Sequence, residues 1–300
     1  QAAYGGLVEN HTLDAAGNPV TTGDAEGNTL RITDGAVAAA YGANVAVKDG
    51  AAQDNAAEIS GGTVTGNVYG GALTAAGATK NATGNQARVT GGTVTGNVYG
   101  GAITDAAASG NVTGSSVAIA GGTVTGTVYG GHNAGTGTAT GGTVTITGGH
   151  MGAVYGGYTA GTGATTGNTI NLGTADTVTP AGTVTAAGTP VAAGTSIGNI
   201  YGGNQSAVTN NTLNVYSAAT AANVDKFERV NFNVTSNVTA GSTMLTLTDG
   251  AASHIDWATL RLTNLNALIP SNTTGRLLTL VAGTNPISFD NYGGIGAIEK

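Results

Sequence analysis

Tyrosine directly before glycine is the most regular chemically useful feature of this 300-residue sequence, and eight of its ten tyrosines have this arrangement. Four of them recur at the same point of a repeated segment: Tyr69, Tyr99, Tyr129 and Tyr155. Phenol rings that recur in this way can stack, with the following glycine pair allowing a sharp corner. We expect this structural role first. The alternative is an exposed stripe of rings and hydroxyls that contacts a sugar chain or another copy of the protein.

Threonine pairs form a second regular pattern. The triplet Thr-Val-Thr recurs and gives the paired positions Thr63, Thr65, Thr93, Thr95, Thr123 and Thr125. In an extended strand both threonines of a triplet point to the same side. These ranks are a candidate interaction surface. They also resemble the Thr-x-Thr ranks of ice-binding β-helices, so ice binding is an alternative function.

Charged and metal-ligating residues give no catalytic pattern. A general acid–base pair needs two carboxyl groups close to one substrate bond, but Asp34 and Asp54 fall at different positions of the repeat, and Asp105 lies in a variable stretch. His132 and His150 each follow a glycine pair but at different places, so we interpret them as turn residues rather than metal ligands. Cysteine is absent, which excludes thiolate chemistry. We expect no catalysis, metal or cofactor; a polysaccharide-acting β-helix enzyme is the alternative.

The same residues belong to a repeat that predicts the fold. The segment GGTVTGNVYGG occurs at 61–71 and again at 91–101, and GGTVTGTVYGG follows at 121–131. Upstream lie triplets in which two apolar residues flank a variable one, a pattern typical of half-buried strands. Seven triplets recur, at 30–32, 57–59, 87–89, 117–119, 144–146, 170–172 and 213–215. A strand that returns once per repeat indicates a parallel β-helix, an all-β solenoid of about seven coils over residues 1–222. At about 4.8 Å per strand it would be about 34 Å long, and the rule for parallel crossovers makes it right-handed.

Stacked coils place equivalent residues one strand apart, which gives specific predictions. Arg31, Glu58 and Arg88 fall at one outward position and should form a structural ladder of alternating charge, worth about 0.2–1 kcal/mol per pair. Asn67 and Asn97 should stack as an amide ladder at a turn. The stretches between the repeats vary in sequence, so we expect them to be loops.

The composition changes from residue 223 onward. All three phenylalanines and Trp257 lie in this part, and only 7 of its 78 residues are glycine. Alternating runs predict longer strands at 230–234, 243–247, 260–265 and 277–281. An open solenoid end is an edge strand, and a bulkier terminal unit covers such an end in repeat proteins. We therefore expect 223–300 to be a C-terminal β cap or junction region, built in part as a small sandwich or a continued solenoid. A functional binding domain is the alternative.

Charge and composition limit the partners. The net charge of −7 and the pI near 4.8 argue against nucleic acid. The sequence has no basic cluster for an anionic membrane and no visible membrane span, so we expect no direct membrane insertion. Between Asp105 and Asp225 the only charged residue is Asp176. A surface so poor in charge favours association. The chain begins at Gln1 without a visible signal peptide, and we interpret it as a processed or excised piece.

Two C-terminal segments carry a family resemblance. NTLNVYSAATAANVDKFERVNFNV (211–234) and AGSTMLTLTDG (240–250) resemble the end of the passenger domain in bacterial type V autotransporters. The pattern covers 211–282, and the sequence departs from the family plan because it has no translocation barrel of its own. The resemblance implies an adhesin-like β-helix, displayed at the outer membrane or secreted. It implies adhesion or self-association (cell aggregation, biofilm formation, host-surface contact), with copies of itself or a cell-surface glycan or protein as partners.

Overall fold

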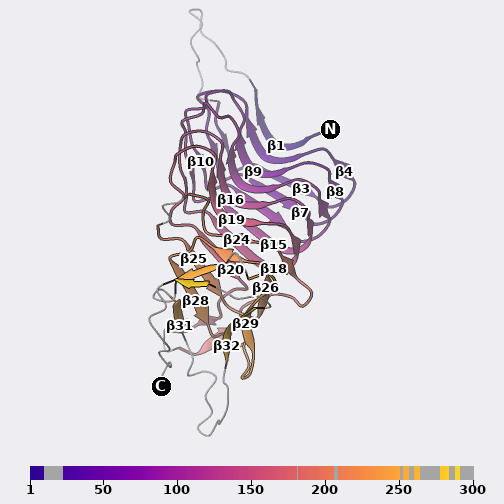
Figure 1. The fold of residues 1–300 in the computed structure, drawn as a ribbon. Coiled ribbons are helices and arrows are strands. Elements are labelled where there is room, and N and C mark those ends of the chain that lie inside the picture. Colours follow the sequence, from indigo (N-terminus) through magenta and orange to yellow (C-terminus); the bar gives the residue numbers. More distant parts are fainter. Residues whose placement is uncertain are drawn as a thin grey trace, which may run out of the picture.

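The computed structural model describes residues 1–9, 23–180, 182–205, 209–250, 253–256, 260–263, 278–283 and 288–290. Within these residues every regular element is a β-strand, and the strands stack into a parallel β-solenoid (Figure 1). The predicted all-β solenoid is therefore confirmed. The solenoid has about eight coils in the described residues. Seven strands of its eight-stranded sheet lie within residues 1–222, and the eighth, Val224–Asp225, lies just beyond.

The tyrosine–glycine segments form an eight-stranded sheet, which we call the tyrosine sheet. Identical residues pair across it: Tyr69 lies beside Tyr99, and Gly71 beside Gly101. In order along the solenoid, its strands are β1 (Ala3–Val8), β5 (Ala40–Val45), β9 (Val68–Leu73), β13 (Val98–Ile103), β16 (Val128–Asn133), β19 (Val154–Thr159), β24 (Ile200–Tyr201) and β27 (Val224–Asp225).

All seven predicted triplets lie in strands of a second, 16-stranded sheet, which we call the long sheet. Its main row contains β3 (Thr29–Ile32), β7 (Ala56–Ile59), β11 (Gln86–Val89), β15 (Ser116–Val124), β18 (Thr143–Met151), β20 (Thr169–Leu172), β25 (Thr212–Val215), β28 (Arg229–Asn233) and β31 (Leu260–Thr263). A flanking row, which includes the Thr-Val segments, contains β4 (Ala36–Val37), β8 (Thr63–Val64), β12 (Thr93–Val94), β23 (Ser196–Ile197), β26 (Ala219–Ala221), β29 (Thr243–Leu247) and β32 (Thr279–Gly283).

The variable stretches are not loops throughout, which corrects the sequence prediction. Each of the first five contains a two-residue strand, and these strands form a third sheet. They are β2 (Ala25–Glu26), β6 (Ala52–Gln53), β10 (Ala82–Thr83), β14 (Val112–Thr113) and β17 (Ala139–Thr140). The first residue of each of these strands is a buried alanine or valine. These stretches therefore form a third side of each coil and do not project from it as loops.

Each N-terminal coil encloses two separate apolar clusters. One lies between the tyrosine and long sheets and includes Ile59 and Val68; the other lies against the third sheet and includes Leu73 and Ala82. A column of polar residues, all buried except the half-buried Asn28, runs between them, and we call it the inner asparagine ladder. Its members are Asn28, Asn55, Asn85, Ser115, Asn168 and Asn211. Where asparagines are adjacent, the amide of one donates to the Oδ1 of the next, at 2.9–3.0 Å, so these amides are paired between coils.

The glycine pair after each tyrosine makes room for this ladder. A Cβ on Gly70 would collide with the carbonyl oxygens of Gly100 and Gln86, and one on Gly71 would collide with Oδ1 of Asn85. Glycine is therefore required here by close approach of two strands and an amide.

Beyond residue 223 the described strands continue the solenoid. β28 pairs with β25, and β31 pairs with β28, all in parallel, while the tyrosine sheet ends at β27. Three of the predicted strands correspond to β28, β29 and β31, and the fourth overlaps β32. Of the predicted alternatives for this part, the continued solenoid describes these strands. A further parallel pair joins β30 (His254–Asp256) to β33 (Ser288–Asp290). The exact domain boundary stays a prediction, and Trp257 lies outside the described residues.

The longest variable stretch contains an antiparallel hairpin. β21 (Thr177–Val178) pairs with β22 (Val184–Ala186), and all five strand residues are exposed. It lies between β20 and β23, where the sequence analysis expected only a loop.

Candidate functional site

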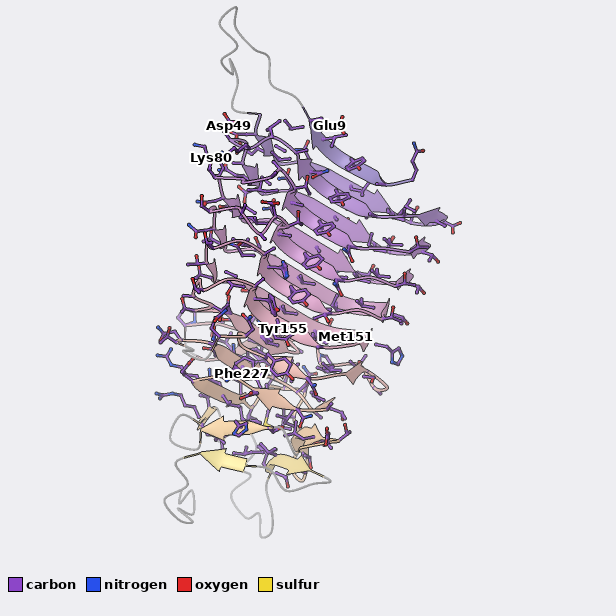
Figure 2. The ribbon with its side chains drawn as sticks, turned by 45° about the horizontal axis from the view of Figure 1, so that its top comes forward. Glu9, Asp49, Lys80, Met151, Tyr155 and Phe227 are labelled. Atoms are coloured by element: carbon purple, nitrogen blue, oxygen red, sulfur yellow. The ribbon has the colours of Figure 1, made fainter. Side chains whose placement is uncertain are left out.

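The predicted tyrosine column is present and is longer than predicted. Tyr69, Tyr99, Tyr129 and Tyr155 stack in succession, with ring centroids 4.8, 5.1 and 5.5 Å apart. The stack continues through Tyr41, Tyr4 and Tyr201, and every interplanar angle along it is 20° or less. In Figure 2, Tyr155 lies within this row across the tyrosine sheet. The spacing between rings follows from the spacing between strands.

The middle of the column is not an exposed stripe, which corrects the functional alternative for these residues. Tyr69 and Tyr99 are only 7% and 8% exposed, because each ring has a neighbouring ring on both faces. A sugar needs a free ring face to stack on, and these rings offer none. Burial raises the pKa of Tyr99 to about 12, although a hydrogen bond from Asn97 partly opposes this. Burial likewise raises the pKa of Tyr41 and of Tyr155 to about 12.

Asn67 and Asn97 link coils, but not as the predicted stack of amides. The Oδ1 of Asn67 accepts the backbone N–H of Asn97 at 2.9 Å, and the Oδ1 of Asn97 accepts that of Thr127 at 2.8 Å. Each Nδ2 donates to the tyrosine hydroxyl two residues later, at 2.8 Å. Both groups of each amide are used, so the tyrosine column is held to the turn beside it.

An aromatic cluster that was not predicted from the sequence lies beside this column. His132 meets the edges of Tyr99 and Tyr129, with centroids 5.2 and 5.0 Å away, and stacks on Tyr158 at 5.1 Å. Burial lowers the pKa of His132 to about 4, although a backbone hydrogen bond partly opposes this, and its Nδ1 has no hydrogen-bond partner among the described residues. His132 and Tyr158 each follow a column tyrosine by three residues, a signal in the sequence that could have placed them together. His132, predicted to be a turn residue, lies in β16 and packs against rings.

The threonine pairs form a short surface on three coils. Thr93 pairs in register with Thr63 and Thr123, and Thr65, Thr95 and Thr125 are exposed. The Oγ1 atoms of Thr95 and Thr125 donate to the carbonyl oxygens of Thr65 and Thr95. In the next coil His150 takes the place of Thr123, so the ranks end there. Ice binding by these ranks stays a prediction.

The charged ladder is in the predicted register, and a second ladder continues it. Arg31 and Arg88 flank Glu58 on neighbouring strands, and Arg31 Nη2 lies 2.8 Å from Glu58 Oε2. Further along the same row is the outer asparagine ladder, Asn171, Asn214 and Asn231. Its amides donate to the preceding Oδ1 at 2.9 and 2.8 Å. Charged residues thus occupy one part of the row, and self-paired amides occupy another.

The other polar residues considered for chemistry are held by the backbone. Asp105 accepts the N–H groups of Gly77 and Ala107 at 2.8 and 3.0 Å, and Asp34 accepts that of Gly35 at 2.7 Å. Within the described part of the chain, no three His, Asp or Glu side chains gather as a metal site. None of the described residues belongs to a helix long and apolar enough to cross a membrane.

These features define a parallel β-solenoid whose surface is a set of side-chain columns. No protein-family model, curated protein or solved structure matches the chain.

Proposed function

We propose that this chain is a non-catalytic extracellular β-solenoid that acts by adhesion or self-association, as a passenger domain of a bacterial type V autotransporter displayed at the cell surface or secreted. The partner is a second copy or a cell-surface glycan or protein. The observation that carries the proposal is the uncharged, ordered surface of the long sheet. It consists of the threonine pairs of three coils and of the outward row between Arg88 and Arg261, which reads Ala118, Thr145 and then the outer asparagine ladder.

Charge normally keeps protein surfaces apart, and its absence along several coils leaves surfaces that can approach one another. The side chains on this surface are also ordered before any contact. Asn214 is hydrogen-bonded to both neighbouring asparagines, and the Thr125 hydroxyl donates to the carbonyl oxygen of Thr95 in the preceding coil. Ordered side chains lose little conformational entropy on binding, which favours a weak, repeated contact.

The passenger assignment rests on the resemblance of residues 211–234 and 240–250. These segments contain the five strands β25 to β29, in which the bulky residues Phe232, Met244 and Leu245 are fully buried. A solenoid that gains larger side chains toward one end is consistent with a junction region.

Cell display tests the proposal. We expect bacteria that display the chain to aggregate or to bind surfaces, and the variant T65K/T95E/T125K to reduce this. The alternating charges keep neighbouring strands attractive, as in the Arg31–Glu58 pair, so the fold should persist. Circular dichroism checks that it does.

The matched control carries the same charges on the opposite edge, as T79K/S109E/T136K. These residues are exposed and occupy equivalent places in successive coils. They belong to the edge near Lys80, away from the edge near Met151 (Figure 2). Aggregation that survives the control but not the first variant supports the threonine side of the solenoid. Displayed cells that neither aggregate nor bind more than cells without the chain would overturn the proposal.

A further inference from the structure

The hairpin β21–β22 differs from every other pair of strands in the described part of the chain. It is antiparallel, and β21 and β22 have no third strand beside them. Val178 and Val184 are 54% and 47% exposed, and they pair directly across the hairpin. Only two other large apolar side chains in the described residues are comparably exposed, Tyr4 and Leu7. The hairpin therefore presents an apolar pair on a ribbon with two open edges.

The base of the hairpin is fixed to the solenoid. Asp176 accepts the N–H of Gly188 and the N–H of Ser236, both at 2.7 Å, and the Ser236 hydroxyl at 3.0 Å. Asn237 donates to the carbonyl oxygen of Gly188 at 2.7 Å. Slight burial raises the pKa of the Asp176 carboxyl group, but these hydrogen bonds outweigh it and the net shift is downward. The carboxylate thus anchors the hairpin, and the exposed strands are presented in a defined position.

The composition of the hairpin points to a second copy as its partner. Each strand overlaps a Thr-Val-Thr triplet, Thr177-Val178-Thr179 at β21 and Thr183-Val184-Thr185 at β22. No charged residue follows Asp176 before Asp225. An uncharged Thr-Val edge meets no like-charge repulsion when it pairs with itself. One strand pairs antiparallel with its own copy about a two-fold axis, which is the commonest symmetry of protein dimers. A two-stranded hairpin is marginal alone, whereas four strands with an apolar face are more stable.

We propose that two copies of this chain join through the outer edge of β22, forming a four-stranded antiparallel sheet in which the Val178 and Val184 pairs of both copies share one face. This inference rests on the proposed function, because it names a second self-association contact besides the threonine side. Exposed edges that are not blocked by charge or proline are the usual sites of such pairing. Pro180 lies in the turn and leaves β22 unobstructed.

Cysteine trapping on the purified full chain tests the contact, because the chain has no cysteine of its own. We expect V184C to form an intermolecular disulfide rapidly under mild oxidation. The matched control A106C, an exposed residue between β13 and β14, should form one only at the slow rate of random collision. Equal rates for the two variants would overturn the inference.

Sedimentation velocity provides a second readout without cysteine. The wild-type chain should show a concentration-dependent dimer, which V178K/V184K abolishes and the control A76K/A106K retains. A wild-type chain that stays monomeric, or a dimer that V178K/V184K leaves intact, would contradict the hairpin contact. If displayed cells still aggregate through the threonine side in that case, the proposed function stands and only this inference fails.

Discussion

The two ends of the solenoid share the parallel pairing of strands and one continuous apolar cluster, but different side chains fill that cluster at each end. On the N-terminal side, two clusters of mostly small side chains flank the inner asparagine ladder, and the second cluster ends at Val112. On the C-terminal side the tyrosine sheet has ended, and one core contains the fully buried Phe232, Met244 and Leu245. The narrow N-terminal coils are thus stabilised by hydrogen bonds and ring stacking between like residues of neighbouring coils. The later coils are stabilised by burial of large apolar side chains. The two regions should respond differently to the same kind of substitution.

The largest difference is expected from removing equivalent core residues. Phe232 and Val89 occupy the same inward position in different coils. Phe232→Ala should lower the free energy of unfolding by about 4 kcal/mol, whereas Val89→Ala should lower it by about 2 kcal/mol, because a smaller cavity results. Urea unfolding measures both. A loss at Val89 equal to that at Phe232 would show that apolar volume contributes alike along the solenoid.

Acid should weaken the solenoid through His132. Its pKa is lowered from 6.5 to about 4 by burial, so between these values the unfolded chain binds a proton that the folded chain does not. Stability is full above pH 6.5 and falls as the pH drops to 4, by about 3 kcal/mol at about 1.4 kcal/mol per pH unit. The measurement is urea unfolding at several pH values.

His132→Ala is the control, because Ala102 fills the same position in the preceding coil. The variant should lose this part of the pH dependence and keep the part that comes from the carboxylates. Parallel losses in the wild type and the variant would contradict the assignment to His132.

The inner asparagine ladder should be sensitive to loss of its acceptor. Asn85 Oδ1 accepts both the N–H and the Nδ2–H of Asn55, at 3.1 and 3.0 Å. Asn85→Ala leaves these buried donors unpaired and should cost about 2 kcal/mol. Asn85→Ser should cost less, since Ser115 naturally occupies the next position of the ladder. Thermal unfolding compares them, and equal stability of the wild type and Asn85→Ala would refute a structural role for the ladder.

The smallest effect is expected at the charged ladder. The Arg31–Glu58 pair is close, but the Arg31 side chain is 71% exposed. Arg31→Ala should therefore lower the free energy of unfolding by at most about 0.5 kcal/mol, and salt should reduce the difference. A loss of several times this size, unaffected by salt, would mean that the pair is not solvent-screened.

The repeats made much of this structure predictable, because identical segments one coil apart must pair in register. This is why the seven triplets, the tyrosine column and the order Arg31, Glu58, Arg88 were placed correctly. Apart from the His132–Tyr158 cluster, the missed features are those without an unbroken repeated signal. The third sheet has strands of two residues, the asparagine ladder is interrupted by Ser115, and the hairpin at Val178 occurs once. The burial of Tyr69 was not predicted, because the rings of the adjacent coils cover both of its faces. The alternation of residues along one strand carries no information about neighbouring coils.

Pairing of like residues in adjacent coils is the central claim, and a disulfide tests it most directly. Thr63 and Thr93 lie in register on neighbouring strands, whereas Thr63 and Thr123 are two strands apart. At about 4.8 Å per strand, only the first pair is within the range of about 7 Å that a disulfide can bridge. T63C/T93C should form an intramolecular disulfide in the folded monomer, and T63C/T123C should keep two free thiols. Bridging in the second variant but not in the first would contradict the stacking of one repeat per coil.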